Sequence, residues 1–360
     1  GSEIKFIKSL CNKNFEINQD LINKNLFLGY KSLNKQNQTF YKEIKILENS
    51  TNITLNLNLE LKFKKYWIPE SRVDKKLNKE DINEIFKQKI TESLKFRLRS
   101  DVPLAFCLSG GIDSGSLSSI ASKILNRNIN TFSIIDEDQR YNEEENIDTV
   151  TKDLNCASHK IQLKKNKDNF FDRMNELVRY HDGPLATISY YVHSFLSEEI
   201  AKKGFKVSIS GTGADEILTG YYDHNLLHLA TLKTSKHYEE NLKNWKKYIL
   251  PNIRNPYLKN HEIYIKNPND RSLVYEEDFN VRAYATQSFK FLFEEEKYSS
   301  ELLRNRMLNE LFHEVVPVIL KHDDLNSMYY SVENRSPFLD KNLLEFSLKI
   351  PPELLISDGF

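Results

Sequence analysis

Residues 103–114 read Pro-Leu-Ala-Phe-Cys-Leu-Ser-Gly-Gly-Ile-Asp-Ser, and this stretch decides the fold of the chain. Its first half is a short, continuous apolar run, which is typical of a strand buried on both faces. Apolar residues then recur at helical spacing from Leu117 to Leu125. The sequence therefore predicts a strand, a glycine-rich loop and a helix in direct succession.

The predicted loop has the chemistry of an anion site. Backbone N–H groups at a helix start bind anions, and glycines let the backbone approach a ligand closely. Ser109 and Ser114 add hydroxyl groups, and Asp113 offers a carboxylate oxygen of the kind that Mg²⁺ prefers. The stretch is not a Walker A sequence, because the Gly-Lys-Ser/Thr ending is absent. The alternative is a serine- and glycine-rich turn in which Asp113 only caps the helix.

Further strands alternate with helices along the chain. Strand-like runs are predicted at 129–135, 159–163 and 206–210, with helical spacing between them. Such alternation predicts an α/β fold, a parallel sheet with helices on both faces and ligands at the carboxyl ends of the strands. A second glycine-rich loop follows the last of these strands, so we expect both loops at one edge. Residues 225–360 are predicted to be a mostly helical extension that walls one side of the site.

The first 70 residues have a different pattern. Apolar and polar residues alternate from Ile53 to Phe63, which predicts a strand, or a hairpin that turns near Asn58, with one face buried. A helix follows over about 82–98, with Asp81 as its expected cap. We therefore predict a boundary near residue 70, which separates a partial N-terminal β domain (1–70) from the main domain (71–360).

Composition narrows the functional class. The 360 residues include 51 Lys and Arg and 51 Asp and Glu, so the formal net charge of zero gives no electrostatic footprint for nucleic-acid binding. Three cysteines without paired or metal-ligand spacing suit a reducing compartment. No apolar run reaches membrane-spanning length and no signal peptide is seen. These features predict a cytoplasmic enzyme that binds neither nucleic acid nor membrane.

Three motifs, in the same order, resemble the synthetase domain of the asparagine synthetase family. They are Arg-Leu-Arg-Ser-Asp-Val-Pro at 97–103 leading into the first loop, Ser-Gly-Thr-Gly-Ala-Asp-Glu at 210–216, and Glu-Asn-Arg-Ser-Pro-Phe-Leu-Asp at 333–340. The family belongs to the ATP pyrophosphatases, or PP-loop superfamily. The resemblance therefore implies an adenine nucleotide alpha hydrolase-like fold, with ATP and Mg²⁺ as cofactors.

The resemblance also assigns expected roles to individual residues. Asp113 and Asp215 would share Mg²⁺, although Asp215 read by itself also suits a helix cap. Asp113, Thr212 and Glu333 are the expected catalytic residues, and Glu216 and Arg335 would face the substrate; a structural Glu333–Arg335 pair is the alternative. ATP would be held by a larger set, in which Leu108 and Ile134 are equally well explained as core residues: Leu108, Ser109, Gly110, Gly111, Asp113, Ser114, Ile134, Gly211, Gly213, Asp215, Tyr221 and Lys321.

Residues 26–67, and Ser2 to Lys5 as a strand, resemble the end of the family's glutaminase domain. The nucleophile of that domain is an N-terminal cysteine, whereas position 1 here is Gly1 and Cys11 is expected to be a small buried residue. We therefore expect ammonia to come from a glutaminase domain missing from this chain. At the other end, residues 351–360 resemble the family just before a segment that carries a lysine important for adenylation.

Thr212 departs from the family, which has glutamate at this position, where a base for the incoming ammonium is needed. Threonine cannot take up a proton near neutral pH. The primary prediction is therefore amide formation from a small-molecule carboxylate through an acyl-adenylate, with the identity of the acid open between aspartate and, for example, a sugar acid of a surface polysaccharide. The alternatives are an intramolecular cyclase of the lasso-peptide or β-lactam synthetase type, and a non-catalytic ATP-binding module. A homodimer is left open.

Overall fold

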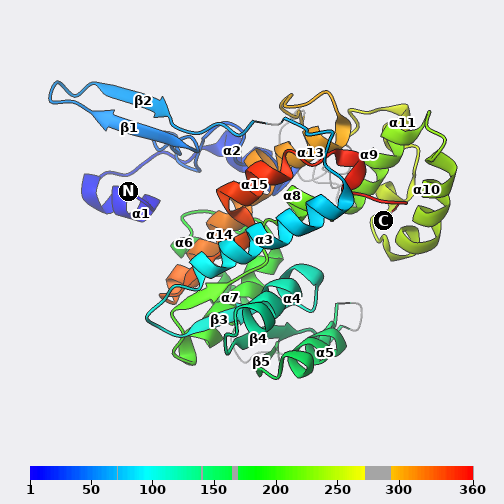
Figure 1. The fold of residues 1–360 in the computed structure, drawn as a ribbon. Helices are drawn as coiled ribbons and strands as arrows, with labels where there is room; N and C mark the ends of the chain where they lie inside the picture. The colour runs from blue at the N-terminus through cyan, green and yellow to red at the C-terminus, as the bar shows by residue number, and fades with distance from the viewer. Residues whose placement is uncertain (71, 139–140, 164–168, 272–292, 360) are drawn as a thin grey trace.

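The computed structural model describes residues 1–70, 72–138, 141–163, 169–271 and 293–359, and its centre is a five-stranded parallel sheet (Figure 1). The strand order is β5-β4-β3-β6-β7. The strands are β3 (Leu104–Cys107), β4 (Asn130–Ile135), β5 (Ala157–Gln162), β6 (Val207–Ile209) and β7 (Glu333–Arg335). The four strands predicted from the sequence are confirmed, whereas β7 is an addition inside the region that was expected to be helical.

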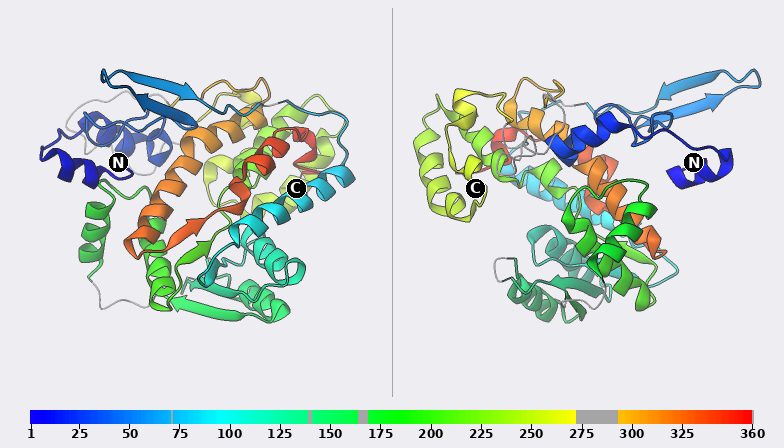
Figure 2. Two further views of the ribbon diagram at one scale, coloured as in Figure 1. Left: turned by 60° about the vertical axis from the view of Figure 1, so that its left-hand side comes forward. Right: turned by 180° about the vertical axis from the view of Figure 1, so that it is seen from behind.

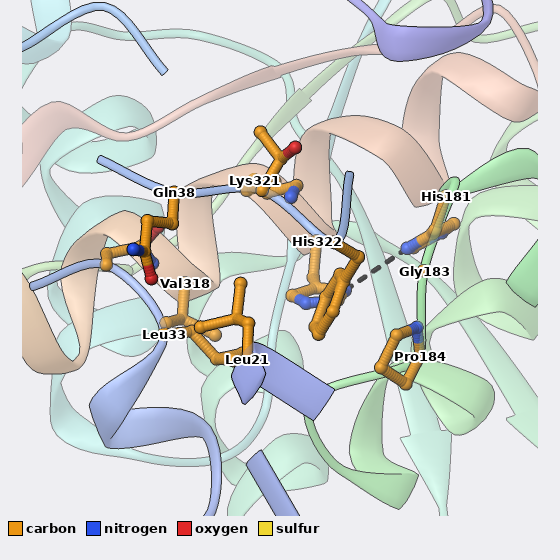
Figure 3. A pocket seen from close by; sticks show the side chains of 12 residues that line it. Leu21, Leu33, Gln38, His181, Gly183, Pro184, Val318, Lys321 and His322 are labelled. Carbon is orange, nitrogen blue, oxygen red and sulfur yellow. Dashed lines mark hydrogen bonds between the residues drawn. The ribbon is translucent and has the colours of Figure 1, made fainter. Parts of the chain in front are cut away.

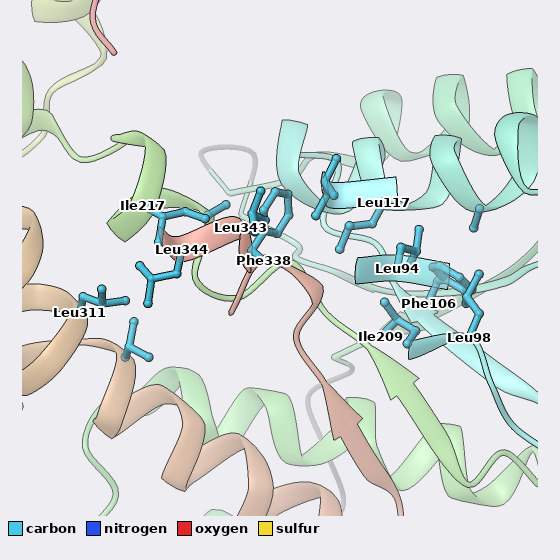
Figure 4. Close-up of a cluster of buried hydrophobic side chains, with 14 of the residues drawn as sticks. Leu94, Leu98, Phe106, Leu117, Ile209, Ile217, Leu311, Phe338, Leu343 and Leu344 are labelled. Atoms are coloured by element: carbon cyan, nitrogen blue, oxygen red, sulfur yellow. The ribbon is translucent and has the colours of Figure 1, made fainter. Parts of the chain in front are cut away.

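Apolar cores on both faces of the sheet confirm the predicted fold class. Phe106 of β3 and Ile209 of β6 belong to a core with α3 (Lys79–Arg97), α4 (Ile112–Ser119) and α15 (Lys341–Ser347). Figure 4 shows this core running from the sheet to the helical part of the chain. Ala105 faces the other side, where it packs with Phe132 of β4 and Ile200 of α7 (Ile188–Lys202). This alternation along β3 is the period-2 pattern of a strand between two layers.

The remaining helices cover the sheet or build the second half of the molecule (Figure 2). α5 (Glu144–Leu154) packs on β4, and α14 (Val316–Tyr329) packs on both α7 and β7. The helical half has a core of its own around Trp245, Tyr264 and Met307. The other α-helices are α6 (Phe170–Tyr180), α8 (Ala214–Leu218), α9 (Tyr222–Leu232), α10 (Tyr238–Asn244), α11 (Ile263–Lys266) and α13 (Leu302–Asn309). Short 3-10 and π turns are η1 (Tyr30–Ser32), η2 (Ile120–Ile124), η3 (Trp245–Ile249), η4 (Leu250–Asn252), η5 (Pro256–Lys259), η7 (Glu310–Glu314), η8 (Pro337–Leu339) and η9 (Pro352–Leu354).

The N-terminal part contains α1 (Ile4–Cys11), α2 (Gln19–Leu28) and an antiparallel hairpin of β1 (Thr51–Leu55) and β2 (Leu61–Lys65). The hairpin projects from the rest of the molecule (Figures 1 and 2). The predicted hairpin is confirmed, but its apolar face is not buried: Ile53 is 47% exposed and Phe63 is 63% exposed. The hairpin has only two strands, and no second layer covers its apolar face. The alternation of apolar and polar residues therefore predicted the strands correctly but not the burial of one face.

Three local expectations are corrected by the structure. The segment expected to begin as a strand at Ser2–Lys5 is the start of helix α1, and Cys11 at its end is exposed. The cap of α3 is Asn78, whose side chain accepts from the Asp81 N–H at 2.9 Å, and not Asp81 itself. The side-chain oxygen of an N-cap residue accepts from a backbone N–H two or three residues later, as that of Asn78 does here. Asp81 itself lies inside the first turn of the helix.

Contacts also cross the boundary predicted near residue 70. The Lys31 ammonium lies 3.9 Å from the Glu310 carboxylate, and Lys35 lies 3.3 Å from Glu314. The N-terminal segment is therefore anchored on buried acidic residues of the helical half. No helix in the described part of the chain combines the length and the apolarity that crossing a membrane requires.

Candidate functional site: two glycine loops and a pair of carboxylates

The first glycine loop joins β3 to α4. Gly111 is the N-cap of α4 and provides no side-chain cap, so the N–H groups of the first turn have no capping side chain. Gly110 has φ +90°, and a β-carbon there would lie 3.0 Å from the β-carbon of Glu143. The Ser109 N–H donates to the Ser114 hydroxyl at 3.1 Å, which closes the loop on itself. Backbone N–H groups at an uncapped helix start are suited to an anion, so the loop has the geometry that the predicted anion site requires.

The second glycine loop joins β6 to α8 in the same way. Gly213 is the N-cap, has φ +98° and again leaves the helix start without a side-chain cap. The side chain of Leu339 fills the space where a β-carbon of Gly213 would be. Leu339 belongs to the third sequence motif, and the neighbouring Pro337 carbonyl accepts from the Ser93 hydroxyl at 2.6 Å. Part of the third motif therefore fixes the position of the second loop.

The two loops meet at the carboxyl edge of the sheet. Strands β3 and β6 are neighbours, with Phe106 opposite Ile209. A β-carbon at Gly211 would lie 3.1 Å from the Asp113 β-carbon and 3.2 Å from the Ser114 nitrogen. Burial, together with the charge of Asp113, raises the pKa of Asp215 to about 6, and burial raises that of Asp113. Asp113 and Asp215 are therefore close enough to repel each other when both are ionised.

Glu216 and Tyr221 form a buried pair behind the second loop. The Tyr221 hydroxyl donates to the Glu216 carboxylate at 2.7 Å, and Glu216 is only 3% exposed. Burial raises the pKa of Glu216 to about 7. Both residues were predicted to contact ligands, but in this structure they bind each other. Thr212, half-buried at the turn itself, lies with its hydroxyl 3.2 Å from that of Ser210.

A buried ionic cluster adjoins this pair and was not predicted from the sequence. Its centre is Arg306, fully buried, with ion pairs to the side chains of Asp223 (3.1 Å), Glu295 (2.7 Å), Glu310 (2.9 Å) and Glu314 (2.6 Å). The His224 Nε2–H donates to the Glu310 carboxylate at 2.6 Å. The only signal in the sequence was the four-residue spacing of Arg306, Glu310 and Glu314, which normally indicates a solvated helix face.

Among the described residues, Asp223, His224 and Glu310 are the one group whose ligand atoms lie close enough to hold a metal ion, within 4.8 Å of one another. The guanidinium of Arg306 already neutralises both of these carboxylates. We therefore interpret the group as part of the ionic cluster. The Asp113–Asp215 pair fits a cation better, since no Lys or Arg among the described residues forms an ion pair with either carboxylate.

Glu333 and Arg335 lie on β7, and the Arg335 carbonyl accepts from the Ser210 N–H at 3.0 Å, where the second loop begins. Arg335 donates to the carbonyls of Arg97 at 2.7 Å and Arg99 at 2.9 Å, and its ion pair with Glu333 measures 2.8 Å. Glu333 pairs with Val207, the first residue of β6, and its side chain is 58% exposed. The structural Glu–Arg pair, which the sequence left open, describes these contacts. The catalytic role of Glu333 stays a prediction.

The other residues predicted to contact ATP lie in different parts of the structure. Leu108 is 1% exposed and packs with Ile135 and Ile147, so the core alternative applies to its side chain. Ile134 is half-buried on β4 opposite Ile161. Lys321 of α14 lines a cavity of about 20 Å³ with His181, His322 and N-terminal residues including Leu21 and Gln38 (Figure 3). No described residue of that lining belongs to either glycine loop, and burial lowers the pKa of Lys321.

Comparison with known proteins gives one family. The family model described as asparagine synthase matches residues 86–360. Asparagine synthetase [glutamine-hydrolyzing] 1 of Bacillus subtilis is 27% identical over 347 residues, which are 89% of this chain and 52% of that protein. Asparagine synthetase [glutamine-hydrolyzing] 3 of the same organism is 25% identical over 384 residues, covering 100% and 56%. The amidase chyE of Penicillium rubens is 25% identical over 203 residues, covering 52% and 30%. The chain thus spans about half the length of the two asparagine synthetases.

Proposed function

The chain belongs to the asparagine synthase family, and we propose that it forms an amide from a carboxylate at the expense of ATP, which is cleaved to AMP and pyrophosphate. One observation carries the proposal: two uncapped helix starts meet beside a pair of carboxylates at one edge of the sheet. The N–H groups suit phosphate oxygens, and the carboxylates suit the cation that accompanies them.

Asp113 and Asp215 would hold the Mg²⁺ ion. The fit rests on the donor set and on electrostatics: both carboxylates are half-buried, burial raises the pKa of each, Asp113 further raises that of Asp215, and no Lys or Arg of the described residues forms an ion pair with either. Carboxylate oxygens are the ligands that Mg²⁺ takes together with substrate phosphates. When bound, the ion would neutralise negative charge on the leaving pyrophosphate.

In the proposed reaction a carboxylate oxygen of the acid attacks the α-phosphorus of ATP, and the bond to pyrophosphate breaks. The N–H groups at the start of α4 and the hydroxyls of Ser109 and Ser114 would hold the pyrophosphate while charge develops on it. A nitrogen nucleophile then attacks the acyl carbon, and AMP leaves with the bonding electrons. Preorganised backbone donors suit this task because they need no reorganisation when the charge appears.

Thr212 favours an acid other than aspartate, or an amine already present on the substrate, as the second candidate. A hydroxyl bonded to Ser210 cannot take the proton of an incoming ammonium ion near neutral pH. The similarity to an amidase adds a relative whose name does not specify asparagine. If ammonia is the nucleophile, we propose that a glutaminase-type domain outside this chain supplies it.

Pyrophosphate release tests the proposal. The chain is incubated with ATP, Mg²⁺, ammonium and a panel of acids that includes aspartate and sugar acids. The carboxyl group of each acid is labelled with ¹⁸O. The expected result is acid-dependent pyrophosphate release with one ¹⁸O transferred to AMP. Asp113→Asn should abolish the signal, and Asp101→Asn, at an exposed position before β3, should keep it.

¹⁵N-labelled ammonium separates the two candidates, because label enters the product of amidation and not that of an internal cyclisation. ATP binding without pyrophosphate release for any acid or cell extract would instead indicate a non-catalytic module. That result would overturn the proposal.

A further inference from the structure

His224 links the second loop to the buried ionic cluster. It lies on α9 and is fully buried. The Gly220 N–H donates to its Nδ1 at 3.3 Å, and its Nε2 lies 2.6 Å from a carboxylate oxygen of Glu310. The direction of the Gly220 N–H makes Nδ1 the acceptor, so the proton on Nε2 is donated to the Glu310 carboxylate. Each ring nitrogen therefore has one partner, and these partners come from different elements.

Gly220 in turn is packed against Asp215. A β-carbon at Gly220 would overlap the Oδ1 atom of Asp215 and lie 2.7 Å from its Cγ. The Gly220 backbone thus forms one wall of the space that the carboxylate occupies. The position of this peptide consequently determines which way the Asp215 side chain can point.

The turn that carries Gly220 needs a restraint. Thr219, the preceding residue, has φ +72°. A β-branched residue in this region is a genuine outlier, and such strain persists only where the surroundings hold it. The bond from Gly220 to His224 provides a restraint at the next residue.

The ionic cluster fixes the ring itself. The second Glu310 oxygen pairs with Arg306 at 2.9 Å, so this carboxylate is held from both sides. All three groups are fully buried, with exposures of 0%. A buried charge that loses its partner is costly, so the cluster has few alternative arrangements. The ring is therefore presented to Gly220 in one orientation.

We propose that His224 is a positioning residue for Asp215: it holds the Gly220 peptide against the carboxylate, and Glu310 holds the ring. The inference rests on the proposed function in that Asp215 is taken as a magnesium ligand. Loss of the Gly220 contact frees the Asp215 side chain to turn away from Asp113. Mg²⁺-dependent ATP binding then weakens, whereas ATP binding without Mg²⁺ is unchanged.

Two substitutions of the same ring separate positioning from general structure. His224→Asn puts an amide oxygen near the place of Nδ1 and keeps an acceptor for Gly220. His224→Gln reaches towards Glu310 and leaves the Gly220 N–H without its partner. Titration calorimetry of ATP at a series of Mg²⁺ concentrations gives the Mg²⁺ requirement for each protein, and thermal melting checks that each is folded.

We expect His224→Gln to raise the Mg²⁺ concentration for half-maximal ATP binding by about tenfold or more, the usual cost of losing a group that orients a metal ligand. His224→Asn should stay within about threefold of the parent. Equal shifts in both variants, or none, would overturn the inference. A parent chain that binds ATP without any effect of Mg²⁺ would overturn the proposed function as well, so the two failures are distinguishable.

Glu310→Gln provides a second route if neither histidine variant folds. Glu310 accepts from His224 with one oxygen and forms an ion pair with Arg306 through the other, and an amide is uncharged and offers only one acceptor. The amide nitrogen must then face one of two donors, which disturbs the ring or the guanidinium. The same rise in Mg²⁺ requirement is expected, and an unchanged requirement in a folded Glu310→Gln protein would contradict the inference.

Discussion

Gly211, in the loop after β6, packs so closely against Asp113, in the first turn of α4, that a β-carbon on Gly211 would lie 3.1 Å from that of Asp113. Its φ lies outside the left-handed region, so an alanine meets no backbone strain there. The contact therefore shows that the two loops are as close as a glycine at this position allows. A larger residue at position 211 would increase the distance between them.

Gly211→Ala should leave the protein folded and push the loops apart by a few tenths of an ångström. We expect weaker Mg²⁺-dependent ATP binding, by about tenfold, measured by calorimetry. The matched control is Gly115→Ala within α4, where a β-carbon would make only an ordinary contact, 3.9 Å from Val150. The control should bind ATP normally and be more stable by about 0.5–1 kcal/mol. Equal binding by both variants would show that the contact does not set the site.

The buried pair of Glu216 and Tyr221 predicts a pH-dependent stability. The pKa of Glu216 is about 7 in the folded protein, against 4.5 for the free group, chiefly because of burial. The folded state thus holds the proton more tightly, so this contribution is fully present below about pH 4.5 and is lost as the pH rises through about 7.

Relative to Glu216→Gln, whose amide oxygen still accepts from Tyr221, the parent should lose on the order of 2–3 kcal/mol of unfolding free energy between pH 4.5 and 8. Urea unfolding of both proteins at several pH values measures this difference. Parallel stability curves for the two proteins would contradict the prediction.

The raised pKa of Asp215, about 6 and caused by burial and by Asp113, predicts competition between protons and Mg²⁺. Magnesium binds the ionised carboxylate, so its apparent affinity in the presence of ATP should be constant above about pH 7. Below pH 6 it should fall by up to about tenfold per pH unit. Asp215→Asn should show weak binding without this pH dependence. A parent whose Mg²⁺ affinity is flat down to pH 5 would rule out a raised pKa at the ligand.

The contacts of Glu333 and Arg335 predict that these residues act on stability. Glu333→Gln removes one partner of a half-exposed pair, so its effect on stability and on the KM for the acid should be small, within about 0.5 kcal/mol for stability. Arg335→Met removes the donors to the Arg97 and Arg99 carbonyls and should lower the unfolding free energy by about 1–3 kcal/mol. Loss of turnover in a stable Glu333→Gln protein would instead support the catalytic role that the sequence predicts.

The sequence predicted the sheet and both loops because their signals are local. The apolar run from Pro103 to Leu108 and the glycines after it determine the strand and the turn within a dozen residues. Strand β7 was missed because its three residues, Glu333–Arg335, are polar and are held in the sheet only by pairing with β6. Its conformation comes from tertiary structure and not from propensity.

The parts of the site that were not predicted depend on which charges are buried. Arg306, Glu310 and Glu314 have the spacing of a solvated helix face, yet all three are fully buried. Only packing brings Asp223, His224 and the N-terminal Lys31 to them. Similarly, the apolar residues of the hairpin predicted strands correctly, but a pattern within one segment cannot specify what covers it.

The proposed function requires that Asp113 and Asp215 act together on one magnesium–ATP complex, and a double-mutant cycle tests this directly. ATP dissociation constants are measured with Mg²⁺ for the parent, Asp113→Asn, Asp215→Asn and the double variant. Because either loss removes the shared ion, we predict that the double variant binds ATP about as weakly as each single one. Losses that simply multiply, or single variants that bind like the parent, would show that the two carboxylates do not share a metal ion.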